Sequence, residues 1–425
     1  MKNILAPVAA LLIGAAILLT GQGLQGTLLP VRAALESFPT LAIGIIGAAY
    51  FFGFTLGCLK GGELVTRVGH VRVFLAMTAL ASATPLIHGL ILHPIAWGLL
   101  RVMAGFCFAV LYIVIESWLN ERATNENRGI IFSTYVMITM TVLAVGQMMT
   151  LLYDPSGLQL FIIASILVSL AAVPVALSTS PSPEQPHSVE PNLRRLYKIS
   201  PAGMFGCLAA GLASGAFWSL APVFTASISE DTSWAAWFMT STVIGGALSQ
   251  WPLGYMSDKF GRRKVLLFAT VCGVGIAAVV AMTFSELSFV SVNLLGLAWG
   301  AVAFPIYAIS VAHANDYAEA DEYVMVSSGL LLMYGSGAIV GPFIASAMMT
   351  YGNAAGLFVF TGITHVILSL YLLQRMVRRA SSPAEQHIDF RDALTTAVTA
   401  SQVYEEEIHQ LAEENAGEAD NSIVT

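Results

Sequence analysis

The chain has 425 residues, of which 56% are hydrophobic and 11% are charged. Ordinary soluble domains carry about 25% charged residues, so this composition excludes a soluble globular protein and indicates one embedded in a bilayer. The formal net charge of −7 comes from the end of the chain, because the residues after Arg379 contain ten acids and one base. No basic patch of the kind that binds nucleic acid is present in the sequence.

The chain contains twelve apolar stretches long enough to cross a bilayer, since a spanning helix needs about 20 mostly apolar residues. They are centred near residues 17, 50, 80, 107, 141, 168, 213, 244, 273, 300, 336 and 365. No small-residue cleavage site closes the first stretch, so we expect it to be retained as a helix and not removed as a signal peptide. The expected fold class is all-α and integral to the membrane, with twelve transmembrane helices.

Composition divides the chain into four segments. Residues 1–178 and 200–378 each hold six of the apolar stretches, and each is expected to form a six-helix bundle. Residues 179–199 include a polar, Pro-rich and Ser-rich run, which is typical of a linker. Residues 379–425 form an acidic tail, for which a short amphipathic helix and disorder are both open.

The two six-helix segments repeat one another. The run from Gly62 to Arg72, between the second and third stretches, returns 192 residues later as the run from Gly254 to Lys264. Further matches at nearly the same spacing pair Gly105 with Gly300, Tyr112 with Tyr307, Asn120 with Asn315 and Gly146 with Gly341. Transporters built from two such repeats bind their solute at the seam between the halves, so the repeat predicts two pseudo-symmetric bundles with a site between them.

The basic residues indicate an orientation. Lys and Arg gather in the loops on one side of the predicted helices, which places that side and both termini in the cytoplasm. The opposite loops carry four acids and only one base, Arg32. The chain is therefore expected to be a multi-pass protein of the bacterial inner membrane.

Residues for metal, nucleotide or covalent chemistry are missing from the sequence. The four cysteines fall inside predicted helices, without CxxC or metal-ligand spacing, and are expected to be small core residues. No Gly-x-x-x-x-Gly-Lys-[Ser/Thr] loop and no nucleophile constellation occurs. We therefore expect no metal and no cofactor, and neither an enzyme nor an ATP-driven pump.

The repeated loop carries a recognisable motif. Residues 254–264 match the pattern G-x-L-a-D-r-x-G-r-r-k of the major facilitator superfamily, with Met256 at the Leu position. With twelve helices and the loop in both expected places, residues 1–378 resemble that superfamily. Further segments look like its YcaD-like bacterial branch, namely Arg101-Val-Met-Ala-Gly105, Val114-Ile-Glu-Ser117, Asn127-Arg-Gly129 and Gln250-Trp-Pro-Leu-Gly254.

The resemblance implies a cytoplasmic gate. Asp258, at the end of the eighth helix, would face Arg128 at the start of the fifth helix and latch the outward-open state; the alternative is that Asp258 only caps its loop. The first repeat has Thr66 in place of the acid, and Tyr323 stands in place of the base, so the gate is expected to be asymmetric. The gating set also includes glycines, which allow helices to approach closely and loops to turn tightly, and basic residues, which keep the loops on the cytoplasmic side. These residues are Gly62, Gly69, Gly254, Gly261, Arg67, Arg262 and Arg263.

Two ionisable residues lie inside the fourth predicted helix. Arg101 stands roughly 10 Å inward from its outer end, and an Arg at such depth costs at least about 2.5–3.5 kcal/mol, so it needs a partner or a solute. The resemblance implies anion contact or proton coupling for it, and a structural hydrogen bond is the alternative. Glu116 lies roughly 22 Å further along, out of reach of Arg101. We expect Glu116 to act in gating by pairing with loop bases such as Arg67 or Arg128, with proton carriage as the alternative.

Other polar and aromatic residues are candidates for the wall of a central solute site or, equally, for packing between helices. They are Gln22, Gln25, Tyr112, Gln147, Trp218, Tyr307 and Tyr334. Trp97 and three further aromatics fall near helix ends and are expected to anchor the chain at the membrane interface. Asp316 and the acids that follow it are expected to form a solvated face.

We expect a secondary transporter that moves a small organic solute across the inner membrane by alternating access, coupled to protons. Its partners would be the solute, protons and the bilayer, and the resemblance implies a monomer. Helix five has Gly146-Gln147 where drug/proton antiporters have Gly-Pro, which weighs against multidrug efflux, the second candidate among transporters. The alternative from another class is a membrane sensor or assembly partner whose output is the acidic tail.

Overall fold

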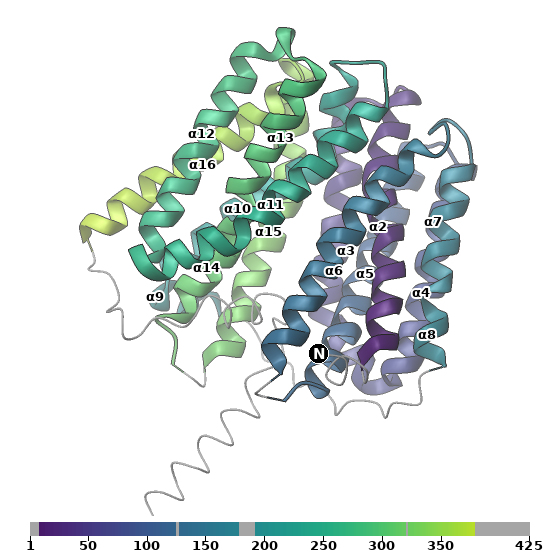
Figure 1. Cartoon of the computed structure of the whole chain (residues 1–425), viewed down its shortest axis with the longest axis horizontal. Helices are drawn as coiled ribbons and strands as arrows, with labels where there is room; N and C mark the ends of the chain where they lie inside the picture. The colour runs from purple at the N-terminus through teal and green to yellow at the C-terminus, as the bar shows by residue number, and fades with distance from the viewer. Residues whose placement is uncertain (1–7, 125–126, 178–191, 320–321, 379–425) are drawn as a thin grey trace, which may run out of the picture.

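The computed structural model describes residues 8–124, 127–177, 192–319 and 322–378 (Figure 1). The predicted acidic tail and most of the predicted linker, residues 379–425 and 178–191, lie outside the described residues. Within the described ranges all regular structure is helical. This follows from the apolar composition, because a backbone inside lipid must satisfy its own hydrogen bonds.

The first bundle contains six crossings of the membrane. Its helices are α2 (Ala9–Leu35), α3 (Thr40–Val68), α4 (His70–Leu90), α5 (Pro94–Glu121), α6 (Arg128–Met148), α7 (Gln159–Leu170) and α8 (Ala172–Ala176). A 3-10 turn, η2 (Met149–Leu151), extends α6, and α7 and α8 together make one crossing.

The second bundle follows a short helix, α9 (Leu193–Ile199). Its helices are α10 (Pro201–Ala226), α11 (Ser233–Phe260), α12 (Arg262–Thr283), α13 (Phe289–Ala303), α14 (Pro305–Asn315), α15 (Tyr323–Tyr351) and α16 (Gly356–Arg378), with a 3-10 turn η3 (Phe284–Glu286) after α12. Pro305 begins α14 and divides the α13–α14 crossing into two helices, because proline cannot donate the next helical hydrogen bond.

Eleven of the crossings in the described part of the chain are long and apolar enough to span a membrane. The twelfth, α11, is 28 residues long but less apolar, because it carries hydroxyl residues that are buried against neighbouring helices. It packs between α6 of the first bundle and α10 and α13 of the second. The expectation of twelve transmembrane helices in two bundles is confirmed.

The internal repeat is visible in the packing. In the first bundle α2 packs on α6, α3 on α5 and α4 on α7; in the second α10 packs on α15, α11 on α13 and α12 on α16. A Cβ at Gly105 would overlap the carbonyl oxygen of Tyr50, and a Cβ at its repeat partner Gly300 would overlap that of Thr242. Glycine is therefore required twice, at matching positions, for the same close helix contact.

The two bundles share one apolar core at one end only. We call the end where α2, α4 and α10 begin the basic end, since the loops with Arg67, Arg128 and Arg262 lie there, and the opposite end the far end. Toward the far end, Leu28 and Ile46 of the first bundle pack in the same apolar cluster as residues of α10 and α15.

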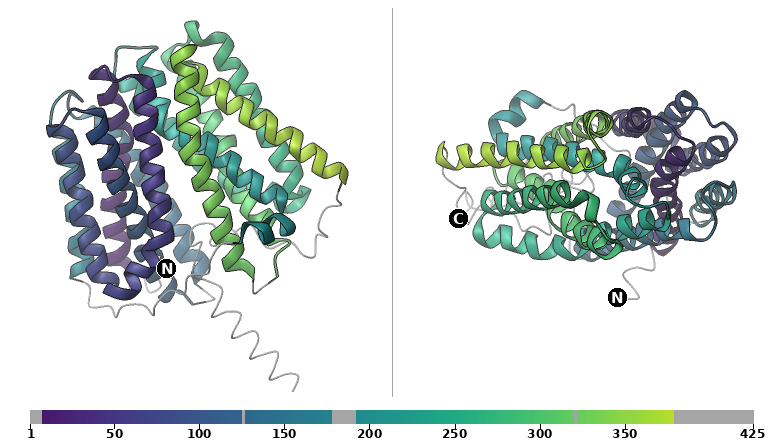
Figure 2. Two further views of the ribbon diagram at one scale, coloured as in Figure 1. Left: turned by 180° about the vertical axis from the view of Figure 1, so that it is seen from behind. Right: turned by 90° about the horizontal axis from the view of Figure 1, so that it is seen from above.

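Toward the basic end the bundles have separate cores. One cluster contains residues of the first bundle alone, and two others contain residues of α9 and the second bundle alone. Figure 2, left, shows the ribbons of the two bundles meeting near the far end and diverging toward the end where the chain begins. The structure is thus a conformation closed at the far end.

The contact that closes the far end makes a testable prediction. A Cβ at Gly47 of α3 would overlap the side chain of Ser219 of α10, and overpacking of this kind costs about 1–3 kcal/mol. Gly47→Val is therefore expected to reduce the population closed at the far end by roughly tenfold. The measurement is the rate at which a maleimide reaches Cys58, which is half-buried at the seam, in a variant with no other cysteine.

The matched control is Gly98→Val, because a Cβ at Gly98 meets nothing within 4 Å. Labelling of Cys58 from the basic end is expected to slow in Gly47→Val and to stay unchanged in Gly98→Val. Equal rates in the two variants would mean that the α3–α10 contact does not hold the far end closed.

Candidate functional site

A chain of polar side chains runs through the interior of the first bundle. The Arg101 guanidinium lies over the ring of Tyr50, with Cζ 4.0 Å from the ring centroid. The hydroxyl of Tyr50 accepts a hydrogen bond of 2.8 Å from Nε2 of Gln22, and Oε1 of Gln22 accepts one of 2.9 Å from the hydroxyl of Tyr112. Glu116 stands one helical turn beyond Tyr112 on α5. We call these five residues the polar chain.

Three helices supply the polar chain: α2 carries Gln22, α3 carries Tyr50, and α5 carries the other three residues. Gly105 lies one turn from Arg101 and lets α5 touch the backbone of α3 at Tyr50, which brings the Tyr50 ring under the guanidinium. Arg101 and Glu116 do not touch, as the spacing predicts, but Tyr50, Gln22 and Tyr112 fill the interval between them.

The positive charge of Arg101 has no counterion within the described ranges. Its side chain is half-buried, and no ion pair or hydrogen bond of its guanidinium is found there. The titratable groups in electrostatic range are Tyr50 and His88, and neither is negatively charged at neutral pH. The structural alternative left open by the sequence, a hydrogen bond from Arg101 to backbone carbonyls, is not formed within the described ranges.

Glu116 lies among the tyrosines of both bundles. It is half-buried and in electrostatic range of Cys58 on α3, Tyr135 on α6 and Tyr307 on α14. Tyr307 belongs to the second bundle, so the electrostatic neighbourhood of Glu116 includes both bundles. No ion pair of Glu116 occurs within the part of the chain that is described.

The expected pairing of Glu116 with loop bases is wrong for this conformation. Arg67 pairs instead with Glu63 of its own helix at 2.5 Å, and Arg128 donates a hydrogen bond of 2.8 Å to Asn120. Glu63 stands one turn from Arg67, so that pair forms without moving either helix. Glu116 therefore has Cys58, Tyr135 and Tyr307, and not the loop bases, as its electrostatic neighbours.

Residues of the second bundle complete the seam opposite the polar chain. The rings of Tyr307 and Tyr334 lie 4.9 Å apart between their centroids. A Cβ at Gly335, next to Tyr334, would lie 2.5 Å from the hydroxyl oxygen of Thr55 on α3, so α15 and α3 are in close contact there. Of the residues expected at a solute site, Arg101, Gln22 and Tyr112 are linked through Tyr50 in the first bundle, and Tyr307 and Tyr334 lie together in the second.

Three other candidates lie elsewhere. Gln25 is buried and donates a weak hydrogen bond of 3.3 Å to the Gly21 carbonyl of its own helix. Gln147 is buried near the far end, where it accepts a hydrogen bond of 3.4 Å from Thr240 across the seam. Trp218 stacks on Phe304, with 5.5 Å between ring centroids, beside the far-end core. The observed contacts of these three residues are those of packing between and within helices, the alternative to a solute site.

Comparison with known proteins agrees with this architecture. The sequence matches the family described as Major Facilitator Superfamily over residues 11–228 and 203–405. The chain belongs to the major facilitator superfamily. It is therefore a multi-pass membrane protein and a secondary transporter, not an enzyme, and the resemblance read from the repeated loop is confirmed.

Individual relatives place the chain more narrowly. The uncharacterised MFS-type transporter YcaD of Escherichia fergusonii is 27% identical over 382 residues, covering 89% of this chain and 97% of the relative. The uncharacterised MFS-type transporter YE1530 of Yersinia enterocolitica is 27% identical over 379 residues, covering 86% and 95%. The expected similarity to the YcaD-like branch of the superfamily is confirmed.

Solved structures share the fold at low sequence identity. The nucleoside transporter NupG has a TM-score of 0.70 and 14% identity, covering 87% of this chain and 99% of that one. A bacterial homologue of the human lysosomal transporter Spinster, in an inward-facing and occupied conformation, has a TM-score of 0.70 and 14% identity, covering 90% and 97%. These likenesses extend over both bundles of the superfamily fold.

The gating loop of the second bundle is braced within that bundle. The buried Arg262 guanidinium donates to Asp316 at 3.1 Å and to Ser257 at 2.8 Å, and it forms an ion pair with Asp258. This ion pair lies within the second bundle, and Arg128 donates a hydrogen bond to Asn120 within the first. Asp258 and Arg128 lie in different bundles, which have separate cores at this end. The latch expected for the opposite conformation stays a prediction.

The glycines and remaining bases of the gating set take several roles. Gly69 and Gly261 have φ of 94° and 93°, a region that residues with a Cβ rarely adopt, so both repeats turn tightly at the expected place. Gly254 is buried, whereas a Cβ at Gly62 would meet nothing within 4 Å. Arg263 is buried and donates to the Arg375 carbonyl at 3.2 Å, which ties α12 to the end of α16.

Removing the charge at the centre of this brace is expected to destabilise the transporter. The side chains of Arg262 and Asp316 are each only 1% exposed, and breaking a buried ion pair from one side costs about 3–5 kcal/mol. Arg262→Met should therefore lower the unfolding temperature in detergent strongly, and the double variant Arg262→Met with Asp316→Leu should recover most of the loss. Lys264→Met, at an exposed neighbouring base, is the control. If Arg262→Met is as stable as Lys264→Met, the ion pair of Arg262 with Asp316 does not stabilise the second bundle.

Asp316 is thus a correction to the sequence-based expectation, which placed it on a solvated face. A further acid of that group, Glu322, forms an ion pair of 2.5 Å with Arg195 of α9. The hydrogen bond from Arg195 holds the pKa of the Glu322 carboxyl below its usual value. This attachment of α9 to the start of α15 is therefore retained at neutral pH and is lost only as the pH falls through that lowered pKa.

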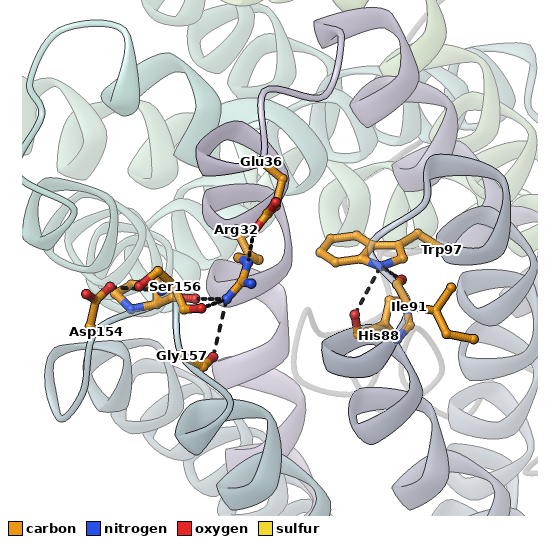
Figure 3. A network of polar contacts seen from close by, with 9 residues as sticks. Arg32, Glu36, His88, Ile91, Trp97, Asp154, Ser156 and Gly157 are labelled. Atoms are coloured by element: carbon orange, nitrogen blue, oxygen red, sulfur yellow. Dashed lines mark hydrogen bonds and ion pairs between the residues drawn. The ribbon is translucent and has the colours of Figure 1, made fainter.

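The far-end loops of the first bundle are held by two buried side chains (Figure 3). Arg32 pairs with Glu36 at 2.8 Å and donates to the carbonyls of Pro155 and Gly157 at 3.0 and 3.4 Å. Trp97 is 0% exposed, and its indole N–H donates to carbonyls of the α4–α5 turn, the nearer of them at 2.8 Å. The expectation that Trp97 anchors at the membrane interface is wrong, because its polar edge is satisfied inside the bundle.

Tyr50 is the residue of the polar chain that sequence reasoning missed. It lies in an apolar run, Gly47-Ala-Ala-Tyr-Phe-Phe-Gly53, where an aromatic residue is expected to pack against lipid or core. The available signal was its hydroxyl, which needs a partner inside a membrane. That signal could not name Arg101 or Gln22 as the partner, since both lie on other helices.

Proposed function

We propose that this transporter moves a small organic solute across the bacterial inner membrane and couples that movement to protons. The observation that supports this most directly is the polar chain in the interior of the first bundle, which has Arg101 at one end and Glu116 at the other, neither with an ion pair in the described part of the chain. Ionisable groups are costly in that environment and mark solute or proton pathways. Arg101 is the proposed solute contact, and Glu116 is the proposed proton carrier.

The proposed orientation has the basic end and both termini in the cytoplasm, because cytoplasmic loops retain Lys and Arg. The conformation closed at the far end would then be inward-facing. Residues 1–178 and 200–378 are the two units proposed to rock about the seam, joined by the linker at 179–199, and the monomer is the proposed working form.

Solute-driven proton movement in vesicles tests this proposal. The purified protein is reconstituted with a pH-sensitive dye inside, and pools of sugars, nucleosides, amino acids and carboxylates are added in turn outside. We expect one pool to change the internal pH, and a protonophore to remove the change. If a labelled solute from any pool exchanges across the vesicle membrane without moving protons, solute transport stands and proton coupling is overturned.

A further inference from the structure

The neighbours of Arg101 show what kind of ligand it can take. The hydroxyl of Tyr50 and the side chains of Gln22 and Tyr112 engage one another in hydrogen bonds of 2.8 and 2.9 Å. The guanidinium has five N–H donors, and none of them is used within the described ranges. A ligand that supplies hydrogen-bond acceptors could therefore bind to the guanidinium of Arg101.

Charge narrows the ligand further. Among the described residues, the titratable groups in electrostatic range of Arg101 are Tyr50 and His88, neither of which is a carboxylate. Glu116 stands fifteen residues along the same helix, roughly 22 Å away. A buried cation without a counterion attracts an anion strongly, and a guanidinium matches a carboxylate with two parallel hydrogen bonds.

The surroundings of the guanidinium are aromatic. Phe54 lies 6.1 Å from Tyr50 and 6.0 Å from Tyr112 between ring centroids, which makes a continuous wall on α3 and α5. Phe54 and Tyr112 are half-buried. An aromatic ligand body would stack on this wall and be removed from water.

We propose that the solute is a small organic anion, with a carboxylate that pairs with Arg101 and an aromatic body that packs on Tyr50, Phe54 and Tyr112. This inference rests on the proposed function and adds the substrate class to it. The carboxylate approaches the free edge of the guanidinium while the face of the guanidinium stays on the Tyr50 ring.

Binding of matched pairs of compounds to the purified protein tests the proposal. The probes are phenylacetate with phenylacetamide, indole-3-acetate with indole-3-acetamide, and acetate as the anion without a ring. We expect at least one aromatic carboxylate to bind, with its amide and acetate at least tenfold weaker, since a hydrogen bond to a charged group accounts for about tenfold or more in affinity.

Variants assign the effect to Arg101. Arg101→Gln is expected to weaken carboxylate binding at least tenfold, Arg101→Lys to weaken it less because the charge remains, and Arg378→Gln, the same change at an exposed site, to leave it unaltered. If Arg101→Gln does not fold, the Lys variant and the comparison of carboxylate with amide in the unmodified protein decide the question.

Three results would overturn the anion proposal: amides that bind as tightly as their carboxylates, an Arg101→Gln protein that binds as the unmodified one does, or no binding of any aromatic carboxylate. If the vesicle assay then gives proton movement with sugars or nucleosides, proton-coupled transport stands and only the substrate class fails. If no pool moves protons and no labelled solute exchanges, the proposed function itself fails.

Discussion

Glu116→Gln is expected to abolish solute-driven proton movement while solute binding and exchange persist. Glutamine has nearly the shape of a protonated carboxyl group but cannot release a proton. A group positioned for proton transfer contributes about 100-fold or more to the step that it serves, so coupled proton flux should fall by about that factor. The vesicle assay measures proton flux, and exchange of labelled solute between the two sides measures the uncoupled step.

The neighbours of Glu116 make this the clearest single test of coupling. Cys58, Tyr135 and Tyr307 are uncharged at neutral pH, so among the described residues no salt bridge holds the Glu116 carboxylate in its ionised form. Glu121→Gln, an exposed acid at the end of the same helix, is the matched control. Proton flux that survives in Glu116→Gln would show that the proton travels by another group.

Charge reversal at the proposed latch is expected to have the second large effect. Asp258 is 28% exposed and pairs with Arg262 here, which leaves it able to meet Arg128 when the basic end closes. Asp258→Arg would then repel Arg128 and prevent that closure. We expect Asp258→Arg and Arg128→Asp each to reduce solute exchange at least tenfold, a change of about 1.4 kcal/mol in the gating equilibrium.

Reversing both charges together is the decisive arm of this experiment. The double variant Asp258→Arg with Arg128→Asp restores an opposite pair across the seam, so exchange should recover substantially. Lys259→Asp, next to the latch on the exposed side of α11, controls for a change of charge at this end. If Asp258→Ala exchanges solute at the full rate, the latch between Asp258 and Arg128 is contradicted, and Asp258 serves only as a local partner of Arg262.

The sequence predicts the helices and turns of the backbone better than the side-chain contacts of the candidate site. Hydropathy located the spans because lipid imposes the same length and polarity on each of them. Only α11 falls short of that pattern, since its hydroxyl residues are buried against protein. The turns at Gly69 and Gly261 were also predictable, because few residues besides glycine accept their positive φ.

Side-chain partners were predicted less well. The charge and depth of Arg101 could be read from its place in α5, but its contact with Tyr50 depends on how closely α3 approaches α5. Glu116 was assigned to the loop bases on distance along one helix, whereas Arg67 pairs with Glu63 and Arg128 with Asn120. Trp97 and Asp316 were placed at the surface because their burial depends on neighbours from distant segments.

The sequence by itself determined the membrane class, the twelve spans, the duplication and the superfamily, because each depends on composition and spacing along the chain. Only the tertiary structure decided that Gln22 joins Tyr50 to Tyr112, that Arg262 braces Asp258 and Asp316, and that the far end is the closed one. Contacts between helices depend on their rotation and crossing. An alternating transporter has more than one such arrangement for a single sequence, so spacing along the chain cannot select among them.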